Sequence, residues 1–355
     1  MKGLILSGGR GTRLRPLTYT SAKQLVPVAN KPVLFYGIES LAAAGIGEIG
    51  IVVGDTQAEI RAAVGDGSAW GVRVTYIEQD APRGLAHAVL ISEPFIGRDP
   101  FVVYLGDNLL NKGIGRFVDE FNREQPAAQI LLAHVPDPQM FGVAELADGR
   151  VVRLVEKPAE PKSDLALVGV YMFSPAVFDA VRAIRPSFRN ELEITDAIQT
   201  LIDRGLAVRP HIVDGWWKDT GKLEDVLEAN RLILETIERR IEGSVDAASR
   251  VEGKVVVEAG AVIEQSVVRG PVIIGARARI VQAYVGPFTS IMNDAEVRES
   301  EIEHSIVLEG SSITNLGTRI EDSLIGKNVR IYRLPVKPSA YRFMLGDNSE
   351  VGVRW

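Results

Sequence analysis

The feature of this sequence that most restricts its fold is a regular spacing of aliphatic residues in the C-terminal part of the chain. From residue 257 to residue 302, aliphatic positions follow one another at steps of six or five residues, and three successive steps span 17 residues. Val257 and Ile274 are separated in this way, as are Val268 and Val285. So regular a period predicts a solenoid whose coils each have three short faces, with the aliphatic side chains stacked in its core. The alternative is an ordinary β-sandwich in which the spacing is accidental.

Before residue 240 the pattern is different, because short apolar runs alternate with helix-like stretches. The apolar runs lie at 4–6, 49–53, 72–77, 101–105 and 130–135, and the helix-like stretches at 32–44, 57–64, 85–92 and 114–122. This order predicts an α/β fold with a Rossmann-like, mostly parallel sheet and helices on both faces. Ligands of such sheets bind beyond the carboxyl ends of strands, so the loops after Leu6 and Leu105 are the first candidates.

The two patterns suggest three segments in the 355-residue chain. We expect a catalytic domain at 1–243, the solenoid at 251–335 and a tail at 336–355. Strand-like and then helix-like runs continue from Phe141 to the end of the first segment, and a long helix is expected over 222–242. We expect the aromatic residues of the tail to cap the last coil or to pack on a neighbouring subunit.

Composition excludes several classes of protein. The net charge of −6 argues against a nucleic-acid partner. The absence of cysteine excludes disulfides, thiolate zinc sites and cysteine nucleophiles. No apolar run approaches the length of a membrane span, and glycines and arginines follow the first apolar run too soon for a signal peptide. We therefore expect no membrane partner and a cytoplasmic location.

A glycine-rich loop follows the first predicted strand. Gly8, Gly9 and Gly11 let the backbone approach a polyanion closely, and their N–H groups can form an anion-binding nest. Arg13 adds a planar cationic group that suits phosphate oxygens, and Lys23 adds a compact positive charge. The loop therefore predicts binding of a phosphate-containing ligand.

Taken alone, this loop allows other interpretations. It is not a dinucleotide fingerprint, because position 14 is leucine, and it is not a Walker A loop, because no Gly-Lys-Ser/Thr sequence follows. A glycine-rich turn with surface arginines remains possible. Prolines at positions 16, 27 and 32 predict that the chain beyond the loop is extended rather than helical.

A series of ordered motifs, which covers about residues 1–240, resembles the signature of sugar nucleotidylyltransferases. The motifs are Leu6-Ser7-Gly8-Gly9-Arg10-Gly11-Thr12-Arg13-Leu14, Pro16-Leu17-Thr18, Lys23-Gln24-Leu25-Val26-Pro27-Val28, Gln79, Pro82-Arg83-Gly84-Leu85-Ala86, Leu105-Gly106-Asp107-Asn108, Phe141-Gly142-Val143, Glu156-Lys157-Pro158, Val168-Gly169-Val170-Tyr171, Glu191-Leu192-Glu193-Ile194-Thr195-Asp196 and Trp217-Lys218-Asp219-Thr220-Gly221. Lys23-Gln24 resembles the glucose-1-phosphate thymidylyltransferase branch in particular. Longer members of that branch carry a left-handed β-helix of hexapeptide repeats after the catalytic domain.

The resemblance implies a reaction. A sugar-1-phosphate oxygen attacks the α-phosphorus of dTTP, giving dTDP-glucose and pyrophosphate for deoxysugar biosynthesis, with Mg²⁺ as cofactor. The nucleophile is already an anion at neutral pH, so catalysis consists of positioning and electrostatic stabilisation. A homo-oligomer is expected. UTP, or another sugar-1-phosphate, is an alternative substrate.

The resemblance also assigns roles to charged residues. Arg13 would steady the triphosphate and the leaving pyrophosphate, Lys23 would contact phosphates across the reaction centre, and Lys157 would hold the sugar phosphate. Asp107 and Asp219 would bind Mg²⁺, which usually takes one or two carboxylates together with phosphate oxygens and water.

The remaining assignments concern substrate binding. Gln79 can both donate and accept hydrogen bonds, which suits the imide edge of thymine or uracil, and Gly84 would let a base lie close to the backbone. Glu156 would accept hydrogen bonds from sugar hydroxyls. The complete expected set is Gly8, Gly9, Gly11, Thr12, Gln24, Gln79, Pro82, Gly84, Asp107, Gly142, Glu156, Lys157, Val168 and Trp217.

Other interpretations stay open. Asp219 precedes a predicted helix and is also a candidate for its N-cap, and Glu156 with Lys157 is also compatible with a surface ion pair. Hexapeptide solenoids occur in acyltransferases, but His304 is the only histidine within the repeats, so a structural and oligomerising role is favoured. A non-catalytic regulatory paralogue ranks last, because the expected cationic and metal-binding residues are all present. His87 is placed near the nucleotide, and the other histidines are expected to be structural or on the surface.

Overall fold

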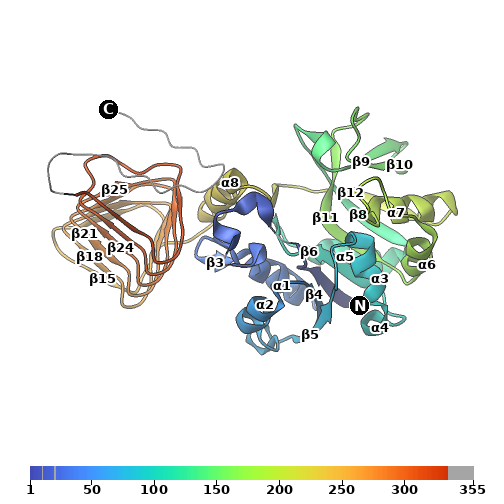
Figure 1. The fold of residues 1–355 in the computed structure, drawn as a ribbon, viewed down its shortest axis with the longest axis horizontal. Coiled ribbons are helices and arrows are strands. Elements are labelled where there is room, and N and C mark those ends of the chain that lie inside the picture. Colours follow the sequence, from blue (N-terminus) through green and yellow to red (C-terminus); the bar gives the residue numbers. More distant parts are fainter. Residues whose placement is uncertain (10, 20, 335–355) are drawn as a thin grey trace. The chain divides into compact units, whose positions relative to one another are not determined.

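The computed structural model of the protein describes residues 1–9, 11–19 and 21–334 (Figure 1). The chain forms two compact units, the first from Met1 to Ile237 and the second from Glu238 onward, and each is described by itself. The tail at 336–355 lies outside the described residues, as do residue 335 and Arg10 of the glycine-rich loop.

The first unit is built on a nine-stranded, mostly parallel sheet. Its parallel core has the order β5-β4-β1-β6, and β11 then runs antiparallel to β6. Beyond β11 lie β8 and β12 along most of its length, and the β9–β10 hairpin at one end. The strands are β1 (Lys2–Leu6), β4 (Glu48–Val53), β5 (Arg73–Glu78), β6 (Phe101–Leu105), β8 (Ala128–His134), β9 (Gly142–Ala147), β10 (Arg150–Glu156), β11 (Leu165–Phe173) and β12 (Val208–Ile212).

Helices cover both faces of this sheet because successive strand residues point to opposite sides. On β1, Leu4 and Leu6 join one buried cluster with α3, α4, α6 and α7, whereas Ile5 joins a second cluster with α1, α2 and α5. The helices are α1 (Val33–Ala43), α2 (Gln57–Val64), α3 (Leu85–Ile91), α4 (Glu93–Ile96), α5 (Gly115–Glu124), α6 (Ala176–Ala183), α7 (Ile194–Asp203) and α8 (Leu223–Leu234). The predicted Rossmann-like α/β architecture is confirmed.

The structure corrects two local predictions. The chain after the glycine-rich loop is not simply extended, since it forms three single 3₁₀ turns at Thr12–Leu14, Leu17–Tyr19 and Lys23–Leu25, followed by the short hairpin of β2 (Pro27–Val28) and β3 (Lys31–Pro32). Helix α8 ends at Leu234 rather than near residue 242, because the chain beyond it pairs with strands of the second unit from Arg240 onward.

The second unit is a stack of parallel coils with three faces (Figure 1). One face consists of β14 (Arg240–Ile241), β17 (Val255–Val257), β20 (Val272–Ile274), β23 (Thr289–Ile291), β26 (Ile306–Val307) and β28 (Leu324–Ile325). The second consists of β15 (Ser244–Val245), β18 (Val262–Glu264), β21 (Arg279–Val281), β24 (Glu296–Arg298), β27 (Ser312–Thr314) and β29 (Arg330–Tyr332). The third consists of β16 (Arg250–Glu252), β19 (Val267–Arg269), β22 (Tyr284–Val285) and β25 (Glu301–Ile302).

The predicted solenoid is confirmed, since the spaced aliphatic residues form its buried core. Val257 pairs with Ile274, and Val268 with Val285, at the predicted separation of 17 residues. The coils begin at Arg240, ahead of the start predicted at residue 251, because β14 and β15 carry too few aliphatic residues to extend the sequence period.

Among the described residues no helix combines the length and the apolar character that crossing a membrane requires.

Candidate active site

The glycine-rich loop lies at the carboxyl end of β1 and is held by contacts with Lys23 and Thr18. Gly11 has a left-handed φ of 62°, and a Cβ added there would lie 2.7 Å from the Cβ of Lys23. The Thr18 hydroxyl donates a hydrogen bond to the Gly11 carbonyl at 2.7 Å. Only glycine combines this backbone conformation with so close an approach, so Gly11 brings the Lys23 side chain next to the loop.

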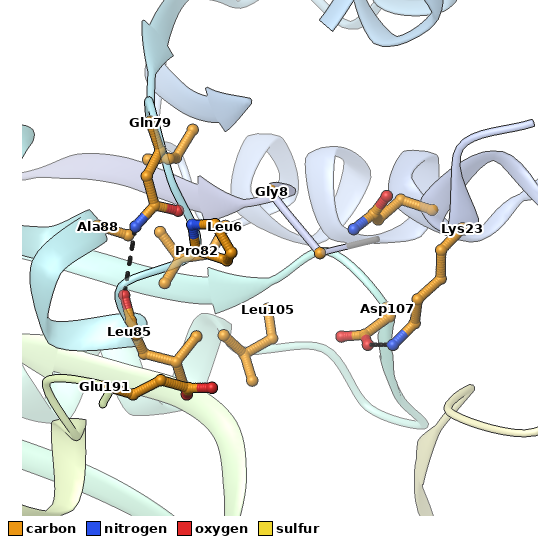
Figure 2. Close-up of a pocket in the computed structure, with 14 residues that line it drawn as sticks. Leu6, Gly8, Lys23, Gln79, Pro82, Leu85, Ala88, Leu105, Asp107 and Glu191 are labelled. Atoms are coloured by element: carbon orange, nitrogen blue, oxygen red, sulfur yellow. Dashed lines mark hydrogen bonds and ion pairs between the residues drawn. The ribbon is translucent and has the colours of Figure 1, made fainter. Parts of the chain in front are cut away.

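A cavity of about 250 Å³ opens beside this loop (Figure 2). The residues with an expected charged or substrate-binding role that line it are Gly8, Gly9, Lys23, Gln24, Gln79, Pro82, Gly84 and Asp107. Sequence analysis did not assign the other lining residues, which are Leu6, Val52, Leu85, Ala88, Leu105 and Glu191. Figure 2 shows Gln79 and Pro82 at one end, and Lys23 pointing toward Asp107 at the other. The cavity thus has a largely neutral end and a charged end.

Asp107 and Asp219 are brought together by a two-stranded antiparallel sheet that the sequence did not predict. In this sheet β13 (Trp217–Asp219) pairs with β7 (Asn108–Leu110), and Asp219 lies opposite Asn108. The backbone N–H and the hydroxyl of Thr220 both donate to the carbonyl of Asp107, at 3.0 and 2.9 Å. Two carboxylates from distant parts of the sequence therefore share one site.

The charges at this site are strongly coupled. The Lys23 ammonium forms an ion pair with Asp107. Burial alone would raise the pKa of Asp107, but the positive charge of Lys23 holds that pKa below its usual value. Burial, and then repulsion by Asp107, raise the pKa of Asp219 to about 7, against the opposing effects of Lys23 and Arg13.

Asp219 is available as a metal ligand. Its buried Oδ1 atom has no hydrogen-bond partner among the described residues, which is costly for a carboxylate unless a cation or a ligand completes the site. The competing interpretation of Asp219 as a helix cap is wrong, because the N-cap of α8 is Lys222.

The donor set fits Mg²⁺. The described residues contain no group of three or more side chains able to enclose a metal ion. Two carboxylates beside a phosphate-binding loop suit a Mg²⁺ ion, which commonly relies on substrate phosphates and water for its other ligands.

The guanidinium of Arg13 and the carboxylate of Asp219 both lie close to Gly221. A Cβ added at Gly221 would lie 3.1 Å from Asp219 Oδ2 and 3.2 Å from Arg13 Nη2. The Arg13 side chain is otherwise exposed, so its guanidinium remains accessible to a phosphate.

A second hollow, of about 490 Å³, adjoins Glu156 at the end of β10. The Glu156 carboxylate lies 3.3 Å from Arg189, and Arg189 also pairs with Glu191 at 2.7 Å and with Glu193 at 3.7 Å. Burial, and then repulsion by Glu193, raise the pKa of Glu156. Glu156 therefore belongs to a partly buried charge network around Arg189 rather than to a simple surface pair with Lys157.

Arg189 and Glu191 are charged site residues that sequence analysis missed. Glu191 was part of a quoted motif, but nothing in the sequence indicates that its side chain reaches the cavity. Arg189 stands just before that motif and had no signal of its own. Lys157 is exposed, with a left-handed φ of 43°, and its N–H donates to the carbonyl of Phe141 at 3.0 Å.

The structure places the remaining expected residues less simply. Val168 is fully buried in the core of the first unit. Trp217 packs against Phe141 and donates from Nε1 to Asn108 Oδ1 at 2.6 Å. Gly142 adjoins the Glu156 network, where a Cβ would lie 3.1 Å from Glu156 Oε2, and Thr12 lies exposed in the 3₁₀ turn that contains Arg13.

Gly84 is required for a reason that the sequence did not reveal. Its φ is 101°, and an added Cβ would lie 2.4 Å from the carbonyl oxygen of Leu192. The missing side chain therefore makes room for the chain near Leu192, and Gly84 also lines the cavity in which a base is expected.

The comparisons with known proteins show the family of the chain. The family described as nucleotidyl transferase matches residues 2–236. The chain belongs to this family. It is 58% identical over 354 residues, with 99% of each chain covered, to a glucose-1-phosphate thymidylyltransferase of Streptomyces griseus. It is 57% identical over 356 residues, with 100% of each covered, to one of Streptomyces antibioticus.

A solved structure gives the same result for the first unit. The protein, from Bacillus anthracis, is described as a glucose-1-phosphate thymidylyltransferase by resemblance and was crystallised with sucrose. It is 38% identical, with a TM-score of 0.62, over 65% of this chain and 94% of its own. The resemblance inferred from the motifs is confirmed, and the chain is an enzyme of the nucleotidyl transferase class.

Proposed function

We propose that this enzyme transfers a thymidylyl group from dTTP to glucose-1-phosphate, giving dTDP-glucose and pyrophosphate. The observation that carries the proposal is the convergence of Asp107 and Asp219 with Lys23 and Arg13 at the charged end of a cavity whose other end holds Gln79. A nucleoside triphosphate has the same polarity, with a neutral base at one end and phosphates at the other. The names of the full-length Streptomyces relatives support the same substrates.

In this arrangement the base lies near Gln79 and Pro82, and the triphosphate lies along the glycine-rich loop. The sugar phosphate enters from the side of Glu156 and Lys157. Lys157 neutralises its phosphate, and Glu156, which Arg189 holds in place at 3.3 Å, accepts hydrogen bonds from the sugar hydroxyls.

The chemistry needs no general base. An oxygen of the sugar phosphate forms a bond to the α-phosphorus, and the bond from that phosphorus to the oxygen bridging the β-phosphorus breaks. Pyrophosphate leaves with the electron pair of that bond. The obstacle is repulsion between two anions, so Lys23 and Arg13 act by holding both phosphates close and by stabilising the charge that develops.

Asp107 and Asp219 would hold the Mg²⁺ ion that this proposal requires. When bound, the ion would screen the negative charge of the triphosphate and orient it for displacement. The Lys23 ammonium also pairs with Asp107. Phosphate binding would give Lys23 a second anionic partner.

The wider setting is also a proposal. The product would feed deoxysugar biosynthesis. We place the enzyme in the cytoplasm, because its proposed co-substrate is a nucleoside triphosphate. The division of the chain into a catalytic domain, a left-handed β-helix and a tail is part of the same proposal. We propose that the β-helix joins subunits into a homo-oligomer, because within the described residues the end strands β14 and β15 have one edge without a strand partner.

One experiment tests the substrates. The enzyme is incubated with Mg²⁺, glucose-1-phosphate and each of dTTP, UTP, CTP, ATP and GTP, and pyrophosphate release is measured. Fastest release is expected with dTTP. Preference for UTP would favour the alternative nucleotide, and no release with any of the five would contradict the proposal for glucose-1-phosphate and favour another sugar or a regulatory paralogue.

A second experiment tests the role of the β-helix. The chain is truncated after Ile237, where the first unit ends, and its mass in solution is measured by light scattering. We expect a smaller assembly that still releases pyrophosphate, because the proposed site residues all precede Ile237. An unchanged oligomeric state would show that the first unit alone makes the interface.

A further inference from the structure

The side chain of Gln79, at the neutral end of the cavity, is held in one orientation by its neighbours. Its amide nitrogen lies 3.0 Å from Nδ1 of His87 and 3.4 Å from the carbonyl oxygen of Gly84. Figure 2 shows the bond to Gly84 as a dashed line from that nitrogen. The amide oxygen lies on the other side, where a Cβ added to Gly8 would be 3.1 Å from it. Gln79 and Gly8 both line the cavity, so the oxygen faces the space for the base.

The hydrogen-bonding capacity of Gln79 is divided accordingly. The amide nitrogen has two hydrogens, and His87 and Gly84 provide one acceptor for each. The amide oxygen retains its capacity to accept. The residue type alone predicts that Gln79 both donates and accepts at the base, but in this arrangement it presents an acceptor only.

His87 can accept from Gln79 only when it is neutral and carries its proton on Nε2, which leaves a lone pair on Nδ1. The surroundings favour that state, because burial, and then the charge of Arg83, lower the pKa of His87, with an opposing effect of Asp80. Arg83 and Asp80 pair with each other at 2.9 Å, and Glu191, in the lining of the same cavity, pairs with Arg189. His87 is therefore an acceptor at neutral pH.

We propose that His87 is a positioning residue for base selection, which holds the Gln79 amide so that its oxygen alone faces the nucleobase. The inference rests on the proposed function, because it concerns the nucleotide at that site. The inference goes beyond the proposed function by naming the group that fixes which bases Gln79 accepts.

The chemistry of the bases gives the reason. Thymine and uracil carry an N3–H donor, which complements the Gln79 oxygen, whereas cytosine has an acceptor at N3. A site arranged to bond a donor rejects an analogue that lacks it, because its polar group is then left unpaired. If His87 did not hold the amide, a flip about the side-chain torsion would turn its NH₂ group to the cavity and suit cytosine.

The test compares three variants with the wild type. His87→Leu removes the acceptor, His87→Gln keeps an acceptor that does not titrate, and His134→Leu changes an exposed histidine that pairs with Asp164 outside the cavity. For each, kcat/KM is measured with dTTP and with dCTP, which share their sugar and triphosphate. We expect the dTTP-to-dCTP ratio to fall about tenfold in His87→Leu, which is the effect of one neutral hydrogen bond, and to stay at the wild-type value in the other two.

A pH series gives an independent reading that does not depend on His87→Leu being folded. Protonated His87 would donate from both ring nitrogens and would repel the Gln79 NH₂ group. The dTTP-to-dCTP ratio of the wild type should therefore fall as the pH is lowered from about 7.5 through the pKa of His87, which lies below the ordinary histidine value, and the ratio of His87→Gln should stay constant.

The outcomes separate this inference from the proposed function. A folded His87→Leu enzyme with the wild-type ratio would overturn the role of His87, as would a ratio with the same pH dependence in the wild type and His87→Gln. Failure of the wild type to release pyrophosphate with either dTTP or UTP would instead overturn the proposed function. A structural role alone would lower the rates with both nucleotides and leave their ratio unchanged.

Discussion

The two units of this chain bury parallel strands in opposite ways. In the first unit helices cover both faces of one sheet, so the strand ends and their loops remain open to ligands. In the second unit three narrow sheets face one another around a single aliphatic core, and each coil is continued by the next.

The treatment of polar atoms differs in the same way. In the second unit Ser266 donates to the carbonyl of Glu264 at 2.6 Å and accepts from the N–H of Ala283, one coil further on, at 3.0 Å. Ser300 makes the same pair of contacts with Arg298 and Leu316. Repetition thus supplies the partners of buried hydroxyl groups.

The first unit leaves buried polar atoms without partners beside its cavity. Within the described chain, Gln24 Oε1 and Asp219 Oδ1 have no hydrogen bond, nor has Ser7 Oγ at the end of β1, and no such atom occurs beyond residue 219. Unsatisfied buried groups are costly and rare in folded proteins. Ser40 Oγ on α1 is also unsatisfied and is not part of the cavity lining, so an orphaned atom points to a ligand only where it stands at the charged end of the cavity, as in Gln24 and Asp219.

The largest effect that tests the difference between the two units is expected on turnover, which should depend on the first unit. Asp107→Asn should lower kcat by about 10² to 10³, the range seen when a key electrostatic group is removed from an active site, with a much smaller change in melting temperature. The measurements are pyrophosphate release and thermal unfolding, and Asp214→Asn, an exposed carboxylate paired with Arg116, is the control. If melting temperature and turnover fell together, Asp107 would be a structural carboxylate.

In the second unit we expect a loss of stability without a loss of turnover. Ile280 is fully buried in the β-helix core, so Ile280→Ala should lower the free energy of unfolding of that unit by about 2 to 5 kcal/mol. The kcat of the native enzyme should be unchanged. Denaturant unfolding and initial rates provide the measurements, with the exposed Arg279→Ala as the matched control. A loss of kcat at native conditions would show that the β-helix core supports catalysis directly.

The smallest expected effect is a gain of stability at the active site. Asp219→Asn removes a buried carboxylate that Asp107 repels, so without metal the melting temperature should rise slightly, by the equivalent of about 1 kcal/mol. Activity should fall at the same time. Unfolding is followed in the presence of a chelator. An unchanged or lower melting temperature would mean that Lys23 and Arg13 already compensate the charge.

Repetition also decided how much of the fold was predictable. The aliphatic period of the second unit is a local signal, and every core position it predicted lies in the core. The main strands and helices of the first unit follow from apolar runs in the same way. The pairing of β7 with β13 could not be predicted from apolar runs, because each strand has three residues and the pairing depends on contacts between segments far apart in sequence.

The candidate site was predictable where a motif implied a chemical role and not where tertiary contacts decide it. Gln79, Lys23 and Asp107 line the expected cavity. The position of Arg189 among three carboxylates has no counterpart in the local sequence. The contact of His87 with Gln79 also has no counterpart in the local sequence, because it depends on the geometry of the loop that precedes α3.

The pairing of β7 with β13 has a consequence for biosynthesis. Thr220, which holds the Asp107 carbonyl, is 113 residues further along the chain. At ordinary rates of translation, about 6 to 23 seconds separate the synthesis of these two residues. The glycine-rich loop and its lysine thus leave the ribosome well before the second carboxylate exists. A nascent chain can form half of the site but not close it, so the enzyme gains its proposed cation site only after nearly all of its first unit has been made.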